Sequence, residues 1–275
     1  TMTRREFGRL AAFAPLIPAA GRAAAKRIPI ALQLYSVRKD CARDMAGTIA
    51  AVAKMGYEAV EFAGYYEHSA KDLKKILDSN NIRCCGTHTA ISTLLGDELP
   101  KTIEFNRIIG NKNLIVPSLD HEKYLGSKDA IIKTAHLFSE ISAKVKPHGM
   151  RVGYHNHSFE FKPMDGEIPF NLFFENAGKD VCIQVDFGNA LAGGGDPVSV
   201  VRRFPGQSIS VHLKDWKAGE KHTLFGQGSV NWKEVFHVCE TVGGTQWYII
   251  EYESEEFPPL ESVKKCLDAF RAMKK

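Results

Sequence analysis

The segment from Tyr154 to Glu160 holds two histidines and a carboxylate within a few residues. The preceding stretch, Met150 to Gly153, has the pattern of a short buried strand. His155 and His157, two positions apart on that strand, would point to the same face. Glu160 follows where the strand should give way to a loop. Imidazole and carboxylate groups placed together in this way are suited to metal binding or to acid–base chemistry.

Polar side chains also stand at the ends of three later apolar segments, as Asp186, His212 and Glu251. A charged group at the end of a core strand is costly unless it has a partner or a function. Together with His155, these residues form a mixed nitrogen and oxygen set. Such a set suits Mn²⁺, Zn²⁺ or Co²⁺ better than Mg²⁺. We therefore expect one divalent metal ion held by His155, Asp186, His212 and Glu251.

The elements that must bring these side chains together alternate regularly from Ile28 onward. Short apolar runs alternate with longer segments whose apolar residues recur at helical spacing. Gly56 is a helix C-cap signal, and Ser69 and Ser127 are placed as N-caps. The expected strands are 28–35, 59–62, 82–87, 113–117, 151–155, 181–186, 209–213 and 247–251. The expected helices are 44–55, one starting at 69, 99–109, 127–149, 169–176, 198–203, 231–242 and 258–273.

Eight strand–helix units in strict alternation predict a parallel sheet. Eight units in about 250 residues are typical of an α/β protein with a single (β/α)₈ TIM barrel, whose active site lies at the C-terminal ends of the strands. An open, doubly wound sheet is the competing fold. It has little support, because no Gly-x-Gly-x-x-Gly follows the first strand. The expected domains are an export signal over residues 1–25 and a catalytic barrel over 26–275.

The N-terminal residues have the pattern of a twin-arginine export signal. Arg4 and Arg5 precede an apolar, alanine-rich stretch from Leu10 to Ala20, and small residues follow it. The alternative is an amphipathic helix that stays attached to the protein. The apolar part is too short to span a bilayer comfortably, so we expect no stable membrane insertion. We expect export, to the periplasm, of a protein that folds and acquires its cofactor beforehand.

Composition indicates a globular protein and gives no support for a nucleic-acid partner. Of 275 residues, 44% are apolar and 25% are charged, which suits a globular protein with a full core. The net charge is +4, and several of the positive charges lie near the N-terminus. The near-neutral body therefore gives no indication of a nucleic-acid partner. None of the six cysteines forms a Cys-x-x-Cys pair, so we expect the cysteines to be structural.

Several motifs resemble the xylose isomerase-like barrel family, and the resemblance covers essentially everything after the export signal. This family contains sugar isomerases and epimerases, dehydratases and endonuclease IV. The motifs are Leu32-Gln-Leu-Tyr-Ser-Val-Arg38, Gly153-Tyr-His-Asn-His157, Val185-Asp-Phe-Gly188, Val211-His-Leu-Lys-Asp215, Gly226-Gln-Gly228 and Glu251.

The resemblance implies a ligand set with one departure. Epimerases of the family hold one divalent metal with Glu, Asp, His and Glu, and the last three match Asp186, His212 and Glu251. The position on the fifth strand that usually holds Glu is His155 here. Either His155 binds the metal, or Glu160 reaches back from the loop in its place. We favour His155, because it lies on the strand itself.

The resemblance also implies a reaction. A metal-dependent isomerase or epimerase would remove the proton beside a sugar carbonyl and pass through a metal-stabilised enediolate. Glu251 is the expected base, His157 or Glu160 would act on the opposite face, and Lys214 would neutralise developing charge. With an acid in that place, the same enediolate leads to elimination. A lyase or dehydratase acting on a keto-sugar or 3-keto-glycoside is therefore the alternative.

Two further functions and three further residues complete these expectations. A non-catalytic sugar-binding barrel or a nuclease like endonuclease IV is less favoured, because a nuclease needs more ligands and a basic face. Glu61, His88 and Trp216 are the expected substrate-binding residues, although strand-end tethering or packing would also explain them. The expected partner is a small sugar or keto-sugar, and an oligomer is compatible with the sequence.

Overall fold

Eight parallel strands close into one barrel in the computed structural model, which describes residues 27–254 and 256–274. The strands follow one another around the barrel in sequence order, and β8 pairs with β1 to close it. The strands are β1 (Ile30–Gln33), β2 (Ala59–Phe62), β3 (Arg83–His88), β4 (Asn113–Val116), β5 (Arg151–His155), β6 (Cys182–Asp186), β7 (Ser210–Leu213) and β8 (Trp247–Ile250). The expected (β/α)₈ barrel is confirmed, whereas the export signal expected over residues 1–25 lies outside the described residues.

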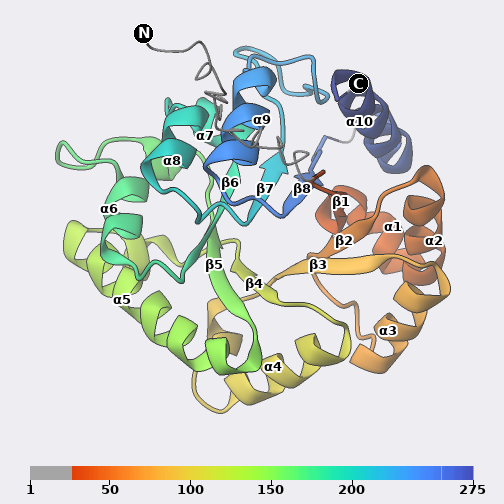
Figure 1. Ribbon diagram of the computed structural model, residues 1–275, viewed down its shortest axis with the longest axis horizontal. Coiled ribbons are helices and arrows are strands. Elements are labelled where there is room, and N and C mark those ends of the chain that lie inside the picture. Colours follow the sequence, from red (N-terminus) through yellow and green to blue (C-terminus); the bar gives the residue numbers. More distant parts are fainter. Residues whose placement is uncertain (1–26, 255, 275) are drawn as a thin grey trace, which may run out of the picture.

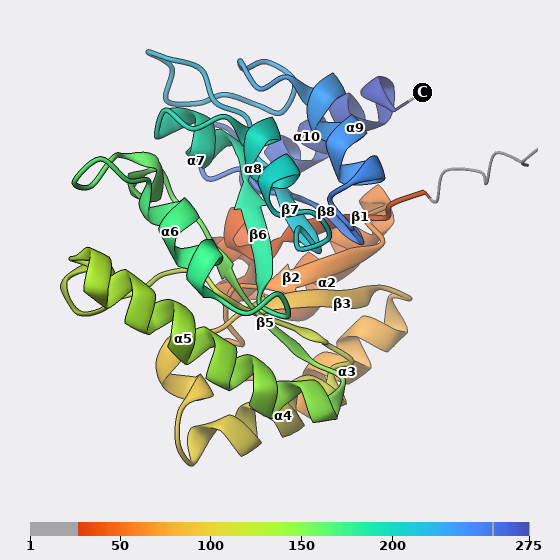
Figure 2. The same ribbon diagram turned by 60° about the vertical axis from the view of Figure 1, so that its left-hand side comes forward.

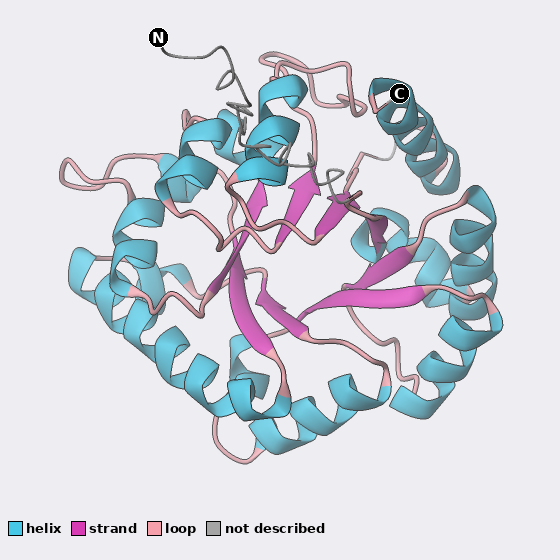
Figure 3. Cartoon of the chain, in the orientation of Figure 1, coloured by secondary structure: helices cyan, strands magenta, loops and turns pink. Residues whose placement is uncertain are grey.

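Helices form an outer ring around these strands (Figure 1). The α-helices are α1 (Arg38–Arg43), α2 (Met45–Met55), α3 (Ala70–Ser79), α4 (Glu98–Ile108), α5 (Lys128–Val145), α6 (Pro169–Asn176), α7 (Phe187–Ala192), α8 (Pro197–Arg203), α9 (Trp232–Thr241) and α10 (Pro259–Met273). Figure 2 shows α5 running beside α6 and along the outside of β5. Figure 3 shows the strands in the centre and the helices around them. Because both faces of each strand are covered, the strands are apolar along most of their length.

Local capping signals set several helix boundaries as predicted. The Ser69 hydroxyl accepts the N–H of Asp72, and the Ser127 hydroxyl accepts the N–H of Ala130. Both bonds satisfy backbone donors that the first helical turn leaves free. At the end of α2, Gly56 adopts a left-handed conformation with φ of 99°, as a glycine C-cap does.

Two polar side chains end their strands in a way that we did not predict. The Gln33 side chain accepts the N–H of Tyr35, and a 3₁₀ helix, Leu34–Val37, begins where we expected the first strand to continue. Asp186 ends β6 and at once caps α7, because its Oδ1 atom accepts the N–H of Asn189 at 2.7 Å. A residue that ends a strand and caps the next helix leaves no loop in which its side chain could move.

All six cysteines lie within the described residues, and all are buried and free. Burial raises the pKa of Cys41, Cys182 and Cys239 to about 12, so their thiols remain protonated near neutral pH. They pack as small apolar groups, as we expected. In the described part of the chain, no helix has both the length and the apolar character needed to cross a bilayer.

Candidate metal centre

Four side chains from the second half of the barrel converge at the C-terminal ends of the strands. They are His155 on β5, Asp186 on β6, His212 on β7 and Glu251 directly after β8. One ligand atom from each lies within 4.8 Å of those from the other three, and all four residues are buried. The register places Asp186 beside His212 on neighbouring strands. The structure thus brings together the four residues that the sequence predicts as metal ligands.

His155 offers a neutral imidazole to this group. Its Nδ1 atom lies 3.1 Å from Oε1 of Gln184. Burial lowers the pKa of His155 well below its ordinary value, and the neighbouring His212 and His88 lower it further. A histidine must be deprotonated on one nitrogen to bind a metal, so this environment favours the form that binds.

Asp186 provides a carboxylate oxygen that accepts no hydrogen bond from the described part of the chain. Its Oδ1 atom caps α7, while Oδ2 is buried and has no hydrogen-bond partner among the described residues. The ammonium of Lys214 comes no closer to Oδ2 than 4.0 Å. Burial raises the pKa of Asp186 to about 7, although the positive charge of Lys214 opposes the shift. A buried oxygen without a partner is costly, and a bound cation would satisfy it.

His212 lies between two carboxylates. Its Nε2 atom is 2.7 Å from Oε2 of Glu61, and its Nδ1 atom is 3.1 Å from Oε2 of Glu251. Burial alone would lower the pKa of His212, but the charges of Glu251 and Glu61 outweigh it and raise the pKa to about 10. In the metal-free protein, a protonated His212 therefore supplies the positive charge that balances the carboxylates of Glu61 and Glu251. A bound divalent cation would supply this charge in its place and leave His212 neutral. The donor types, the convergence and the unsatisfied Asp186 oxygen all fit such an ion.

The structure places Glu61 and His88, expected to bind substrate, against the histidines of the group. Glu61 is completely buried, and its oxygens accept hydrogen bonds from the side-chain amides of Gln33 and Gln184 inside the barrel. The His88 ring stacks on that of His212 at 5.4 Å between centroids, and its Nε2 lies 2.9 Å from Oε1 of Gln184. His88 also lines a cavity of about 240 Å³ together with Tyr65 and Thr89.

Lys214 and His157, expected to act on substrate, border the group. The Lys214 Nζ atom lies 3.8 Å from Oε2 of Glu251 and 2.5 Å from Oε1 of Glu253. Burial alone would lower the pKa of Lys214, but Glu251 and Asp186 keep it above its ordinary value. The His157 ring lies 5.3 Å from that of His155 and stacks on Phe159. Burial, together with the charge of Lys214, lowers the pKa of His157, so its imidazole is neutral near pH 7.

Glu160 and Trp216 are held by other contacts. Oε1 of Glu160 accepts the hydroxyl of Tyr154 at 2.6 Å, and Oε2 accepts the N–H of His157 at 2.9 Å. In the described part of the chain, the group of four clustered ligands does not include Glu160. The backbone N–H of Trp216 donates to Asp215, whose carboxylate also accepts the N–H groups of Gly226 and Gly228. Asp215 thereby organises the loop that carries Trp216.

Three residues of the site were not predicted: Gln33, Gln184 and Glu253. Gln184 stands two positions before Asp186 on β6, so both side chains face the barrel interior. Gln33 ends β1 and pairs in register with Glu61. An amide at an inward-facing strand position is a sequence signal that would have found both glutamines. Nothing in the sequence indicates that Glu253 pairs with Lys214, because a loop brings it there.

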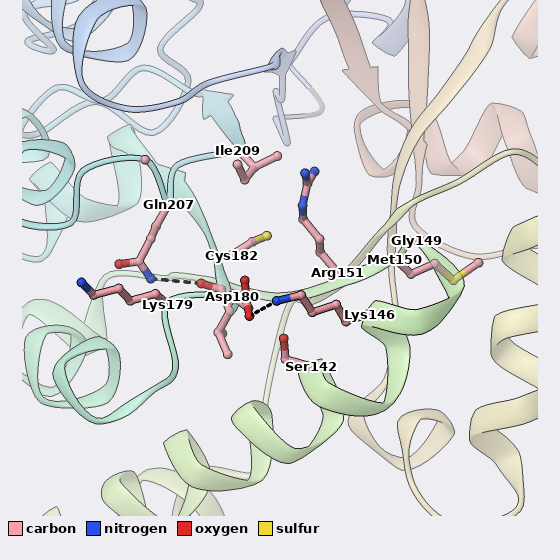
Figure 4. Close-up of a pocket in the computed structure, with 12 residues that line it drawn as sticks. Ser142, Lys146, Gly149, Met150, Arg151, Lys179, Asp180, Cys182, Gln207 and Ile209 are labelled. Carbon is pink, nitrogen blue, oxygen red and sulfur yellow. Dashed lines mark hydrogen bonds and ion pairs between the residues drawn. The ribbon is translucent and has the colours of Figure 1, made fainter.

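A larger cavity of about 370 Å³ lies at the other end of the barrel (Figure 4). Arg151 and Cys182, at the starts of β5 and β6, line it. An ion pair of 2.6 Å between Lys146 and Asp180 crosses it. In barrels of this type the strand starts contribute to stability, and reactions take place at the strand ends. The four clustered side chains therefore mark the functional end of the barrel.

A parallel (β/α)₈ barrel with imidazole and carboxylate ligands at its strand ends defines the class of this protein. The chain belongs to the xylose isomerase-like TIM barrel family, whose sequence model matches residues 49–273. It is 22% identical to an inosose dehydratase of Lacticaseibacillus casei over 255 residues, covering 78% of this chain and 85% of the relative.

Solved structures agree with this assignment. A sugar phosphate isomerase/epimerase from Parabacteroides distasonis ATCC 8503 superposes with a TM-score of 0.75 at 25% identity, covering 93% of this chain and 98% of that one. The IolI protein, solved with a bound zinc atom, superposes with a TM-score of 0.67 at 15% identity, covering 89% and 97%. The family thus includes both dehydratases and isomerases, so membership indicates an enzyme without choosing between the two reactions.

Proposed function

We propose that this protein is a divalent-metal-dependent enzyme that removes a proton beside the carbonyl group of a sugar or sugar-derived ketone. The observation that carries the proposal is the buried convergence of His155, Asp186, His212 and Glu251, with one Asp186 oxygen left unsatisfied. The zinc bound to the structurally similar IolI protein supports it. A divalent ion in this place would polarise the substrate carbonyl and stabilise the enediolate that forms as the proton leaves.

Glu251 is the base in this proposal. Burial alone would raise its pKa, but Lys214 and His212 hold the pKa of Glu251 well below its ordinary value. Its carboxylate is therefore ionised near neutral pH and can accept a proton. Lys214, held by Glu253, keeps a positive charge beside this carboxylate and close to the place where negative charge would develop on the substrate.

The fate of the enediolate decides the reaction. Return of the proton to carbon gives isomerisation or epimerisation, whereas loss of a hydroxyl or alkoxide gives elimination. An epimerase of the expected type needs a second carboxylate on the opposite face. Here that strand position is His155, and both oxygens of Glu160 are engaged by Tyr154 and His157.

These contacts favour a second candidate, a lyase or dehydratase acting on a keto-sugar or 3-keto-glycoside. In this candidate the neutral imidazole of His157 takes part in proton transfer at the leaving oxygen. The similarity to inosose dehydratases supports elimination as well. We further propose that a twin-arginine signal over residues 1–25 exports the protein, which would expose it to free sugars and glycosides rather than sugar phosphates.

The test is ¹H NMR in D₂O on a panel of keto-sugars and 3-keto-glycosides with Mn²⁺-loaded protein at low concentration. Deuterium at the carbon beside the carbonyl together with a new isomer indicates isomerisation, whereas loss of water or of an aglycone indicates elimination. Glu251→Gln should lower turnover by about 10²–10⁴-fold, the usual contribution of a general base. Its metal content is measured in parallel. The matched control is Glu220→Gln, a surface glutamate paired with Lys217. Full turnover by Glu251→Gln would contradict the proposal.

A further inference from the structure

A buried layer of polar side chains lies one step deeper in the barrel than the clustered ligands. Its centre is Glu61, whose two oxygens accept hydrogen bonds from three side-chain nitrogens, while Nε2 of His88 lies 3.4 Å from Oε2. Oε2 lies 2.8 Å from Nε2 of Gln33 and 2.7 Å from Nε2 of His212, and Oε1 lies 2.7 Å from Nε2 of Gln184. The Gln33 amide is oriented independently, because its oxygen accepts the N–H of Tyr35. Glu61 therefore acts only as an acceptor.

We propose that Glu61 and Gln184 are positioning residues that set the tautomers of His155 and His212. They would thereby decide which ring nitrogen each histidine offers to the metal ion. The inference rests on the proposed metal centre, and it concerns two residues that do not belong to the ligand set.

The tautomer of His155 is set by Gln184, which connects this ring to Glu61. An acceptor-only carboxylate fixes the Gln184 amide with its NH₂ group toward Glu61, and that group also contacts the Ser210 hydroxyl at 3.0 Å. The Gln184 oxygen then faces the two neighbouring imidazoles, at 3.1 Å from Nδ1 of His155 and 2.9 Å from Nε2 of His88. Because an amide oxygen only accepts, both nitrogens carry hydrogen. A neutral His155 protonated on Nδ1 has its lone pair on Nε2.

The tautomer of His212 is set by Glu61 directly, and it is the opposite of the tautomer of His155. Its Nε2 atom, 2.7 Å from the Glu61 carboxylate, must carry a hydrogen. A neutral His212 therefore has its lone pair on Nδ1, which lies 3.1 Å from a carboxylate oxygen of Glu251. Two lone pairs facing each other at this distance repel, unless a cation lies between them. The two histidines thus offer different nitrogens: Nε2 from His155 and Nδ1 from His212.

The variant Glu61→Gln has a specific consequence under this proposal. A glutamine places an NH₂ group where one of the donors now points. If the new NH₂ group at position 61 faces Gln184, the Gln184 amide must rotate so that its oxygen accepts from that group. The NH₂ group of Gln184 then points at His155, whose Nδ1 must accept a hydrogen bond rather than donate one. If the new group at position 61 faces His212, Nε2 of His212 must accept instead. In either case one ligand histidine carries its proton on the nitrogen that should bind the metal.

In the exchanged double variant Glu61→Gln/Gln184→Glu, each hydrogen-bond donor of this layer again faces an acceptor. The carboxylate at position 184 accepts from His155, from His88 and from the new amide at position 61. The oxygen of that amide accepts from His212 and Gln33. The double variant should therefore recover both tautomers, although each of its substitutions changes a buried polar residue.

Zn²⁺ alone is the probe in the test, with affinity measured by competition against a chromophoric chelator. Glu61→Gln should weaken Zn²⁺ binding by about 10–100-fold, as is usual when the partner of a ligand histidine is lost. The exchanged double variant should return toward the wild-type affinity. Glu58→Gln is the matched control, because Glu58 directly precedes β2 and pairs with Arg27 at the other end of the barrel. Wild-type affinity in Glu61→Gln would overturn the proposal.

Long-range ¹H–¹⁵N NMR of histidine-labelled protein reads the tautomers directly, which separates positioning from general stabilisation. In the Zn²⁺-loaded wild type, the metal should bind Nε2 of His155 and Nδ1 of His212. Binding through the opposite nitrogen of either ring would overturn the proposal even if Glu61→Gln does not fold. If Zn²⁺ does not bind at all, the metal centre fails, but hydrogen on Nε2 rather than Nδ1 of His155 would still decide against this inference. Turnover is not a readout, so an unidentified substrate does not affect the outcome.

Discussion

At the scale of single residues, buried ionisable groups in this barrel are stabilised by hydrogen bonds to specific partners. Tyr154 and Glu160 are an example, because both are buried and the tyrosine hydroxyl donates to the carboxylate at 2.6 Å. Burial raises the pKa of Glu160 above its ordinary value, whereas the hydrogen bonds from Tyr154 and His157 oppose that rise. Glu160 also accepts the N–H of His157, so this pair fixes the loop that follows β5 and holds the His157 ring beside that of His155.

Tyr154→Phe should destabilise the fold by roughly 1–3 kcal/mol near neutral pH, because a buried carboxylate oxygen loses its donor. The pKa of Glu160 should rise further in the folded state while the unfolded value stays the same. A carboxyl group with a raised pKa favours folding only when it is protonated. The penalty should therefore be largest above the folded pKa and should shrink as pH falls toward about 4.3, the ordinary value for glutamate.

Urea unfolding of metal-free protein at several pH values measures this effect. The matched control is Tyr248→Phe, which removes a hydroxyl that donates to the exposed Glu240 at 3.1 Å. That variant should cost less and show no comparable dependence on acid pH. A Tyr154→Phe penalty that is constant from pH 5 to pH 8 would show that Glu160 does not depend on this donor.

At the scale of elements, the pairing of β2 with β3 makes room for Glu61. The register shifts between Val60 and Glu61, and Glu61 then pairs with Gly86. A methyl group on Gly86 would lie 2.5 Å from Oε1 of Glu61, closer than a real contact allows. Gly86→Ala should therefore displace the Glu61 carboxylate and cost about 1–3 kcal/mol of stability, as overpacking does.

The same variant should weaken Zn²⁺ binding, because His212 loses its aligned acceptor. Gly64→Ala is the control on the neighbouring loop, where the nearest atom to an added methyl group is a Tyr66 ring carbon at 3.9 Å. Chemical denaturation and Zn²⁺ competition on both variants provide the measurements. If Gly86→Ala matches Gly64→Ala in both, Glu61 has more freedom than its buried contacts indicate.

Elements also show how far the sequence alone could predict this structure. Helices capped by Ser69, Ser127 and Gly56 were predicted, because a cap depends on residues within one turn. The helix α7 was not, because its cap is Asp186, a residue already assigned to the end of a strand. The convergence of His155, Asp186, His212 and Glu251 was predicted from their positions at strand ends, since the ends of parallel strands meet at one side of a barrel. The contacts of Gln33 and Gln184 with Glu61 could not be predicted, because they depend on strand register and on the β2–β3 shift.

At the scale of the whole molecule, the cluster of His155, Asp186, His212 and Glu251 lies in one half of the barrel. All four clustered ligands follow or belong to β5, β6, β7 and β8, and none comes from β1 to β4. Three buried acidic side chains surround the buried His212: Asp186 and Glu251 from the second half, and Glu61 from β2 in the first half. A bound ion would tie four neighbouring strands together and remove that electrostatic cost.

Removal of the proposed metal ion should therefore lower the free energy of unfolding. The strands that carry the four clustered side chains should be affected more than the other strands. At a free ion concentration of 100 times the dissociation constant, binding stabilises the folded state by about 2.7 kcal/mol. For a chain of this size, that corresponds to a fall in Tm of roughly 5–10 °C on chelation. Differential scanning calorimetry with and without a chelator measures this change. Glu251→Gln is the control, because its Tm should respond much less to the chelator.

Hydrogen exchange then locates the loss. Amides at the C-terminal ends of β5 to β8 should exchange faster in the metal-free protein, because local opening there no longer has to break metal–ligand bonds. Amides at the ends of β1 to β4 should change little, since that half of the barrel contributes no ligand to the cluster of four. The effect would spread to β2 through the hydrogen bond of His212 with Glu61, and to β3 through the contact of Gln184 with His88. Equal acceleration in both halves would mean that the ion stabilises the barrel as a single unit, contrary to the asymmetry of its ligands.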